Sequence, residues 1–211
     1  MRKFLALAAL LALTGCSASV AEKPDAPINE ELRNELSRRV KEDQDARREL
    51  IDWMKKKGET DPAKAKQAEN DAITKKLVEI DEANTKWLED VVEKHGWPGK
   101  KLVRDKGAHD AWLLVQHADR DRAFQKKCLQ LMKPLVATGD VAKGDFAYLT
   151  DRVLVADGKK QLYGTQFHDV KGKMEPQPIE DEASVDKRRK EMGLSTLAEY
   201  RKIIEEVYQK K

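Results

Sequence analysis

The sequence predicts a mainly α-helical domain with one small β-hairpin, and three features indicate this fold class. Apolar residues recur every three or four positions over long stretches, as in helices that bury one face. These stretches are separated by short turn signals rich in Gly, Pro and Asp. A two-residue alternation, typical of strands, is confined to the region around residues 161–179. We therefore expect a single-domain bundle of six or seven helices over residues 30–211.

The first 15 residues are predicted to be a lipoprotein signal peptide rather than part of this fold. Arg2 and Lys3 precede an apolar run, residues 4–13, which is shorter than the ~20 residues of a membrane-spanning helix. The run ends in Leu13-Thr14-Gly15-Cys16, which resembles the lipobox of bacterial lipoproteins. The resemblance implies a diacylglycerol thioether on Cys16, cleavage before it, and acylation of the new amine, for example by palmitate. An ordinary signal peptide with a chance cysteine is the alternative.

The residues after Cys16 are expected to form a flexible tether to the membrane. Residues 16–29 contain two prolines and mostly small or polar side chains, which is typical of a linker. Ser17 follows the cysteine, and in enteric bacteria a residue other than Asp there usually permits export to the outer membrane. We therefore expect a lipid-anchored protein of the bacterial cell envelope, at the outer membrane and facing the periplasm.

Charge and cysteine content exclude several classes of protein. The formal net charge is +3, and without Arg2 and Lys3 it is +1, although 37% of the residues are charged. Interspersed charges of both signs are typical of solvated helix faces and not of a nucleic-acid-binding patch. After Cys16 only Cys128 remains, so no intramolecular disulfide is expected despite the oxidising compartment.

The first predicted helix, residues 30–57, carries an apolar stripe that two charged residues interrupt. Asn29 is placed to cap its first turn. Following the stripe through the middle of the helix leads to Asp43 and Arg47, whose spacing of four allows them to pair on one face. The apolar members of the stripe are Leu32, Leu36, Val40, Leu50 and Met54.

The second predicted helix, from Pro62 to about Lys94, shows a similar interruption. Its apolar stripe meets Asn84, and Asp81 lies beside it. Two successive helices thus place polar groups where a core is expected, which indicates a shared polar interior. The alternative is that both helices rotate so that these groups face water.

The most informative stretch is residues 107–119, G-A-H-D-A-W-L-L-V-Q-H-A-D. A helix this apolar should be buried, which draws Gln116, His117 and Asp119 toward the interior. Buried polar groups need hydrogen-bond partners. We therefore expect the candidate site to be organised around the end of this helix.

Two further helices are predicted at residues 122–136 and 145–154. The first buries Cys128, which is expected to be an inert core thiol, and Gln125 flanks its apolar stripe. The second carries polar residues close together on one face: Tyr148, Asp151 and Arg152.

The predicted hairpin follows a turn at Asp157-Gly158. Its arms are residues 161–167 and 170–179, and the prolines of the second arm indicate an edge or irregular strand. Two strands alone are marginally stable, so the hairpin is expected to pack on helices. Closing helices are predicted at residues 180–192 and 195–209, separated at Gly193.

Several long motifs resemble a bacterial domain family of unknown function. The family is marked by W-L-L-V-Q-H-A-D and Q-x-Y-G-T-Q, which occur here at residues 112–119 and 161–166. Other similar segments are Phe124-Gln125, A-Y-L-T-D-R-V-L-V, Asp43/Arg47, Asp81/Asn84, His95-Gly96-Trp97-Pro98 and Val185-Asp186-Lys187-Arg188-Arg189. The resemblance covers most of the chain after the tether and implies a fold and a site region, but no activity.

No metal and no cofactor is expected. His109 and His117 lie two turns apart, ~12 Å along a helix, and cannot share one ion while that helix is intact. His117 and Asp119 could join one ligand set only if the helix ends between them. The sequence has no HExxH or CxxC motif, phosphate loop, nucleophile elbow or dinucleotide fingerprint.

Three roles remain open for the polar residues. They could line a cleft that binds a small polar ligand, a peptide or a glycan. They could form a hydrolase-like acid–base site, with His117 as the general base tuned by a buried carboxylate such as Asp119 or Asp151. In that site Arg47 or Arg152 would hold an anionic group of the substrate. They could also form a structural network that fixes helix register without a ligand.

We favour a membrane-anchored envelope lipoprotein that binds a small polar or anionic ligand, or a protein partner, in one polar cleft. The acid–base enzyme and the structural network are the alternatives. The expected ligand-binding residues are Asp43, Arg47, Asn84, Gln116, Gln125, Tyr148, Arg152, Gln161, Tyr163 and Gln166. The catalytic residues of the alternative are His117, Asp119 and Asp151.

Overall fold

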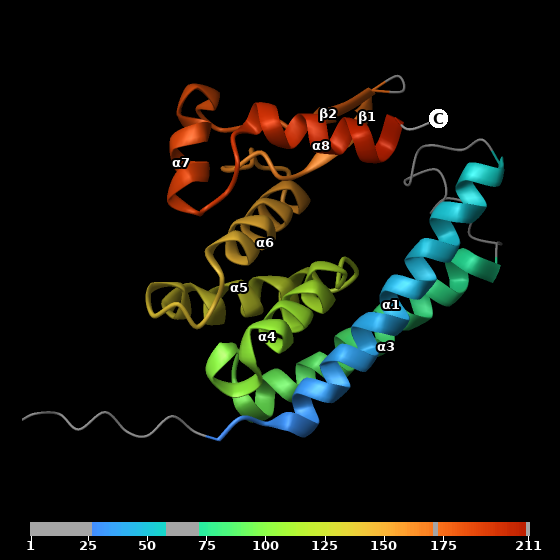
Figure 1. The fold of residues 1–211 in the computed structure, drawn as a ribbon, viewed down its shortest axis with the longest axis vertical. Coiled ribbons are helices and arrows are strands. Elements are labelled where there is room, and N and C mark those ends of the chain that lie inside the picture. The colour runs from blue at the N-terminus through green and yellow to red at the C-terminus, as the bar shows by residue number, and fades with distance from the viewer. Residues whose placement is uncertain (1–26, 58–71, 171–172, 210–211) are drawn as a thin grey trace, which may run out of the picture.

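The computed structural model describes residues 27–57, 72–170 and 173–209, which fold mainly into helices (Figure 1). The described α-helices are α1 (Glu30–Lys57), α3 (Ala72–His95), α4 (Lys100–Gln116), α5 (Arg122–Ala137), α6 (Lys143–Ala156), α7 (Val185–Glu191) and α8 (Leu197–Gln209). With one two-stranded hairpin, this part of the chain confirms the predicted fold class. The predicted signal peptide, Cys16 and the start of the second helix at Pro62 lie outside the described residues.

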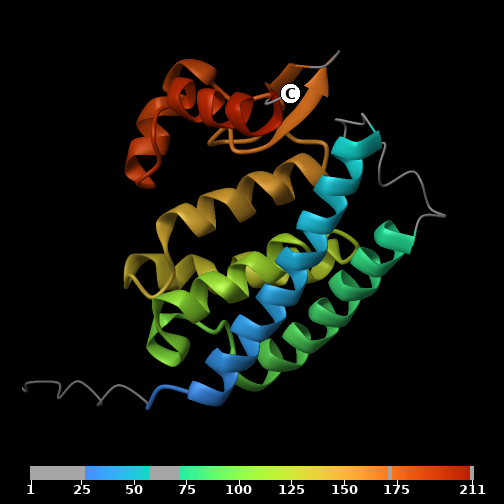
Figure 2. The same ribbon diagram turned by 45° about the vertical axis from the view of Figure 1, so that its right-hand side comes forward.

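The two longest helices, α1 and α3, lie side by side and run in opposite directions (Figures 1 and 2). Asn29 caps α1 as predicted, because its Oδ1 accepts a hydrogen bond from the Leu32 N–H at 2.9 Å. The middle helices α4, α5 and α6 pack beside this pair, and α7, α8 and the hairpin lie beyond α6 (Figure 2).

Two separate apolar clusters hold the helices together. The larger lies among α1, α3, α4, α5 and α6, with Leu36, Leu88 and Val115 in its centre. The smaller lies where the second half of α1 faces the first half of α3 and is built on Ala46, Leu50 and Leu77. The interruption of the α1 stripe, predicted at Asp43, falls between the two clusters.

The helix α4 differs from its predicted range at both ends. It begins at Lys100 rather than near residue 107, and it ends at Gln116, which leaves Asp119 outside the helix. The first turn lacks an apolar stripe, so periodicity could not reveal it, and Arg104 breaks the helical backbone with φ 63° and ψ 176°. The Asp140 carboxylate accepts a hydrogen bond from the Lys101 N–H at 2.6 Å and stabilises this start.

The hairpin is shorter than predicted, and its first predicted arm is mostly irregular. Strands β1 (Phe167–Val170) and β2 (Lys173–Pro176) pair antiparallel, with α8 packed against β2. Residues 161–166 contribute a single bridge, from Gln161 to Ile179. Backbone N–H groups in this segment bind the Asp151 carboxylate instead of a neighbouring strand, which explains the difference.

The predicted closing helices are also shorter than expected. A 3-10 turn (Glu182–Ser184) precedes α7, and α8 begins after a break around Gly193, whose φ of 70° suits a helix C-terminus.

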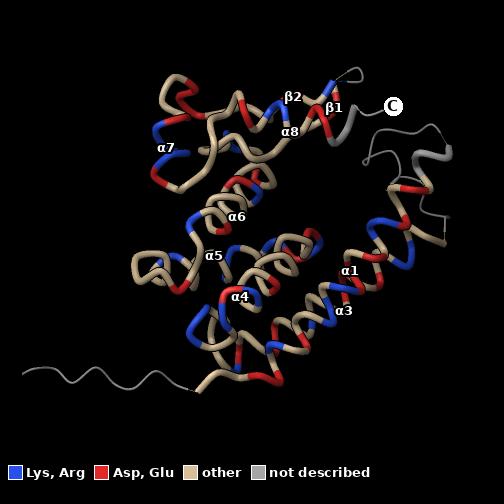
Figure 3. Tube along the Cα trace, viewed as in Figure 1, with Lys and Arg blue, Asp and Glu red and all other residues tan. Residues whose placement is uncertain are grey.

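Charged side chains of both signs are distributed along the helices (Figure 3). None of the helices in the described ranges combines the length and the apolar character needed to span a bilayer.

Candidate functional site

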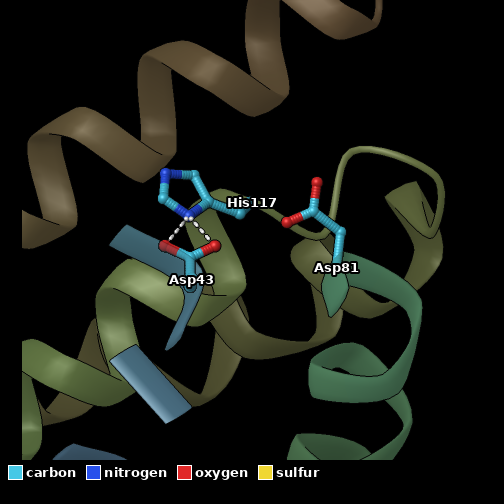
Figure 4. Close-up of side chains that lie close together, drawn as sticks. All are labelled: Asp43, Asp81 and His117. Carbon is cyan, nitrogen blue, oxygen red and sulfur yellow. Dashed lines mark hydrogen bonds and ion pairs between the residues drawn. The ribbon is translucent and has the colours of Figure 1, made fainter. Parts of the chain in front are cut away.

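The polar interior predicted from α1 and α3 exists, and His117 joins it. Asp43 and Arg47 come from α1, Asp81 from α3, and His117 from the residue that follows α4. Asp43 is completely buried. Its carboxylate lies 3.0 Å from Nδ1 of His117, and Figure 4 shows this contact with Asp81 beside the pair.

His117 reaches this position because α4 stops at Gln116. The backbone of His117 has φ −91° and ψ −1°, and its N–H bonds to the Leu114 and Val115 carbonyls as a helix cap. Gln125 secures the same end, since its Nε2 donates to the Val115 carbonyl at 3.0 Å. Asp121 then caps the next helix by accepting from the Phe124 N–H. The predicted site residue Gln125 therefore supports the site from behind.

The hydrogen bonds of the cluster determine the tautomer of His117. Arg47 Nε lies 3.1 Å from both Asp43 Oδ1 and His117 Nδ1. An ionised carboxylate can only accept, so His117 Nδ1 donates to Asp43 at 3.0 Å and the Arg47 N–H donates to the same carboxylate. The proton of neutral His117 is thus on Nδ1, and Nε2 carries a free lone pair. Nε2 points away from both Asp43 and Asp81 (Figure 4), and it has no hydrogen-bond partner among the described residues.

Burial and neighbouring charges set the protonation states. Burial lowers the pKa of His117 more than its hydrogen bond to Asp43 raises it, which favours the neutral ring. Burial alone would raise the pKa of Asp43, but the hydrogen bond from His117 and the positive charges of protonated His117 and of Arg47 lower it to about 2. Near neutral pH the pair is an ionised carboxylate that holds a neutral imidazole, and His117 gains its proton as the pH falls through its lowered pKa.

Arg47 joins the two carboxylates of the cluster. Its Nη2 lies 2.5 Å from Asp81 Oδ1 and 3.1 Å from Asp43 Oδ1. One ligand atom each from Asp43, Asp81 and His117 lies within 4.8 Å of the others, a spacing that could hold a metal ion. The guanidinium of Arg47, however, already contacts both carboxylates. An ion between them would have to displace this side chain.

A pocket of about 330 Å³ opens beside the cluster. Asp81 and His117 both line it, so the network behind them forms part of its wall. The remaining lining residues are Glu82, Thr85, Lys86, Glu89, Ala118, Arg120 and Asp121.

A second group of predicted site residues meets at Arg152. Its Nε and Nη2 donate to the two oxygens of Asp119 at 2.8 and 2.6 Å, a bidentate pair. Its Nη1 lies 3.4 Å from Oε1 of Gln166. The end of the 112–119 motif, α6 and the 161–166 motif are thus brought together. Asp119 pairs with Arg152 and His117 with Asp43.

Asp151 anchors the 161–166 segment. It is completely buried, and its carboxylate accepts hydrogen bonds from three backbone N–H groups and from the Thr165 hydroxyl, at 2.7 to 3.2 Å. Burial raises its pKa although these hydrogen bonds oppose the shift. With both oxygens occupied, Asp151 is placed for a structural role rather than for proton transfer to His117.

The other predicted residues have distinct surroundings. Gln161 is buried and donates to the Gln166 and Gln177 carbonyls, while Tyr163 uses its backbone to bind Asp151 and Arg189. Tyr148 stacks edge-on between Trp112 and Tyr200. Two buried amide atoms, Asn84 Nδ2 and Gln116 Oε1, have no hydrogen-bond partner among the described residues.

Sequence reasoning missed three arginines that support the site. Arg39 donates to Asn84 at 3.0 Å and lies over the Trp87 ring at 4.4 Å. Arg188 and Arg189 bind backbone carbonyls of residues 162 and 163. The helical spacing on α1 could have revealed Arg39, because Arg39, Asp43 and Arg47 recur every four residues. Arg188 and Arg189 lie in a segment that resembles the family, but their local sequence alone does not distinguish them from surface arginines.

Comparison with models of protein families matches residues 31–211 to a family of unknown function, DUF6624. No curated protein and no solved structure matches the chain.

Proposed function

We infer the function from the geometry of the site, because the chain belongs to DUF6624, a family of unknown function. Our proposal is a lipid-anchored protein of the bacterial cell envelope that binds a small polar ligand in the pocket beside His117. We propose that the motifs at residues 112–119 and 161–166 are characteristic of this family. These motifs supply three of the residues in the polar networks described above: His117, Asp119 and Gln166.

One observation carries the proposal: a buried ionic network ends in the wall of a pocket. Asp81 and His117 line the pocket, and Arg47 and Asp43 hold them from behind. Side chains fixed in this way lose little freedom when a ligand binds, which favours affinity. The volume of about 330 Å³ is in the range of small-molecule sites, roughly 300–1,000 Å³.

The charges around the pocket narrow the class of ligand. Four carboxylates line it against two cationic side chains, and one of the cations, Arg120, lies 3.4 Å from Glu82. An anionic ligand would meet this excess of negative charge, so a ligand that donates hydrogen bonds or carries a positive charge fits better. An amino sugar has both properties and is compatible with a location in the cell envelope.

A thermal-shift screen with glucosamine, other sugars, simple amines and peptidoglycan fragments tests the proposal. A ligand that binds the folded state raises the melting temperature. The rise should disappear in Asp81→Asn and His117→Ala. It should persist in His95→Ala, a matched control at the exposed end of α3. If no compound raises the melting temperature, or if both site variants respond like the wild type, the binding proposal is wrong.

The Asp43–His117 pair favours a second candidate, an acid–base hydrolase. A buried aspartate that orients one ring nitrogen and leaves the other free is the arrangement of the aspartate and histidine in hydrolytic triads. The lowered pKa of His117 keeps Nε2 available as a base near neutral pH. The buried carboxylate that orients His117 is therefore Asp43, and not Asp119 or Asp151 as expected from the sequence.

Hydrolysis of an activated ester such as p-nitrophenyl acetate tests this candidate. The rate should rise as His117 loses its proton, fall in Asp43→Asn and vanish in His117→Ala, with His95→Ala unchanged. Activity that survives His117→Ala would eliminate the acid–base role.

The structural alternative makes a different prediction for the same variant. If the cluster only fixes helix register, His117→Ala should lower the stability and change no ligand response. The pocket lined by His117 and Asp81 favours a binding role, because a network that only fixes helix register needs no cavity beside it.

The lipid anchor is tested separately at Cys16. Mass spectrometry of the membrane-extracted protein should find a diacylglycerol-modified, N-acylated cysteine as the first residue. Cys16→Ser should release the protein from the membrane fraction. An unmodified protein cleaved elsewhere would show an ordinary signal peptide.

A further inference from the structure

A second pocket, of about 230 Å³, lies between α4, the turn before α6, and the start of α6. It shares no lining residue with the pocket beside His117. Its lining residues are Trp97, Lys100, Asp105, Ala108, His109, Trp112, Met132, Val141, Ala142 and Asp145.

The walls of this pocket are apolar and its polar groups form two pairs of opposite charge. Most of the wall comes from Trp97, Trp112, Met132 and three smaller apolar residues. The first polar pair joins Lys100 Nζ to Asp105 Oδ1 at 2.7 Å. The second joins His109 Nδ1 to both oxygens of Asp145 at 3.2 Å.

The pair between Lys100 and Asp105 depends on the backbone break at Arg104. In a regular helix of 3.6 residues per turn, residues five apart point about 140° away from each other and cannot pair. The φ of 63° and ψ of 176° at Arg104 redirect the chain, and the two side chains meet at this pocket. This backbone conformation is strained for a residue with a side chain, and such strain is concentrated at functional sites.

His109 is held in a defined position at the pocket. Its ring lies on Trp112, with a centroid distance of 4.8 Å and an interplanar angle of 31°. The hydrogen bond that His109 donates to the Asp145 carboxylate raises its pKa more than burial lowers it, so the ring carries a positive charge over more of the physiological pH range. The indole N–H of Trp112 is buried without a hydrogen-bond partner among the described residues.

We propose that this second pocket binds a free α-amino acid with an apolar side chain. The ligand would open both existing pairs: its ammonium group would replace Lys100 and His109 beside Asp105 and Asp145, and its carboxylate would bind the released Lys100 and His109. Its side chain would lie against Trp97, Trp112 and Met132. The volume is below the roughly 300–1,000 Å³ of pockets for drug-sized ligands, which restricts the ligand to about one amino acid.

Tryptophan fluorescence gives a direct test, because two of the four tryptophans line the pocket. The full chain is excited at a wavelength selective for tryptophan and titrated with L-phenylalanine or L-leucine. We expect a saturable change in emission. Phenethylamine and 3-phenylpropionate each lack one of the two charges and should bind at least tenfold more weakly. No saturable change at millimolar amino acid, or equal binding of the single-charge analogues, would overturn the proposal.

Variants of the pocket residues test whether the change in tryptophan emission comes from binding at this pocket. Asp145→Asn and Lys100→Gln should each weaken L-phenylalanine binding at least tenfold. Lys100 is partly exposed at the first position of α4, so Lys100→Gln remains informative if Asp145→Asn fails to fold. Asp81→Asn, a matched change in the first pocket, should leave the titration unchanged. If Asp81→Asn abolishes the response and Lys100→Gln does not, the amino acid binds at the first pocket and this inference fails, whereas the proposed binding beside His117 survives.

Discussion

Replacing Asp43 by Asn is the sharpest test of the buried network. The substitution keeps the size of the side chain but removes the charge that accepts hydrogen bonds from Arg47 and His117. Because Asp43 is completely buried, water cannot replace these partners. The variant should fold, since Arg47 still pairs with Asp81, but with a lower free energy of unfolding.

The pKa of Asp43 gives the expected magnitude. Its ordinary value is 3.8 and the folded value is about 2. At about 1.4 kcal/mol for each pH unit, ionised Asp43 contributes about 2.5 kcal/mol to stability while both His117 and Arg47 are charged. A carboxyl whose folded pKa is lowered contributes fully above its unfolded pKa and loses this contribution as the pH falls through the folded pKa. About 1 kcal/mol of it should already be lost at pH 3.

Urea denaturation followed by circular dichroism, at pH 7, 5, 4 and 3, measures this contribution. The stability difference between wild type and Asp43→Asn should rise to about 2.5 kcal/mol or more as His117 gains its proton below pH 7, and should then shrink by about 1 kcal/mol as the pH falls to 3. Asp45→Asn is the matched control on the exposed face of α1, where Asp45 pairs with Lys41, and it should change stability little. A difference that stays constant from pH 7 to pH 3 would refute the assignment of an ionised, buried Asp43 held by His117 and Arg47.

Three further predictions concern other parts of the fold. Asp151→Asn should lower the free energy of unfolding, measured by urea denaturation, by about 2–3 kcal/mol. The reason is that an amide N–H₂ would replace an oxygen that accepts from the N–H and hydroxyl of Thr165. An unchanged free energy of unfolding would show that the 161–166 segment does not need this anchor. Arg104→Gly should be about 1 kcal/mol more stable than Arg104→Ala, since glycine tolerates φ 63° and ψ 176°, and equal stabilities would show that the backbone there is unstrained. Burial raises the pKa of Cys128 to about 12, so a thiol reagent at pH 8 should modify it in urea but not in the folded protein, and rapid labelling of the folded protein would contradict its place in the core.

Local sequence patterns were sufficient to predict the structure where one helix buries one face against its neighbours. The apolar stripe of α1 at Leu32, Leu36 and Leu50, its cap at Asn29 and its interruption at Asp43 appear as predicted. The same holds for the burial of Cys128. The start of α4 and the irregular path of residues 161–166 were not predictable in this way. Arg104 adopts a conformation that no propensity favours, and the 161–166 backbone binds a carboxylate on α6 instead of a strand.

The chain by itself determined a helical protein with polar groups directed inward from at least two helices, because periodicity and turn residues act over a few neighbouring positions. Only the tertiary structure decided that His117 pairs with Asp43, that Asp119 pairs with Arg152, and that Asp151 serves a loop. Asp43 and His117 are 74 positions apart in the chain. The carboxylate of Asp43, Asp119 or Asp151 could equally have accepted a hydrogen bond from a buried histidine. The packing of α1, α3 and α4 selected one of them, because that packing fixes which side chains lie within hydrogen-bonding distance.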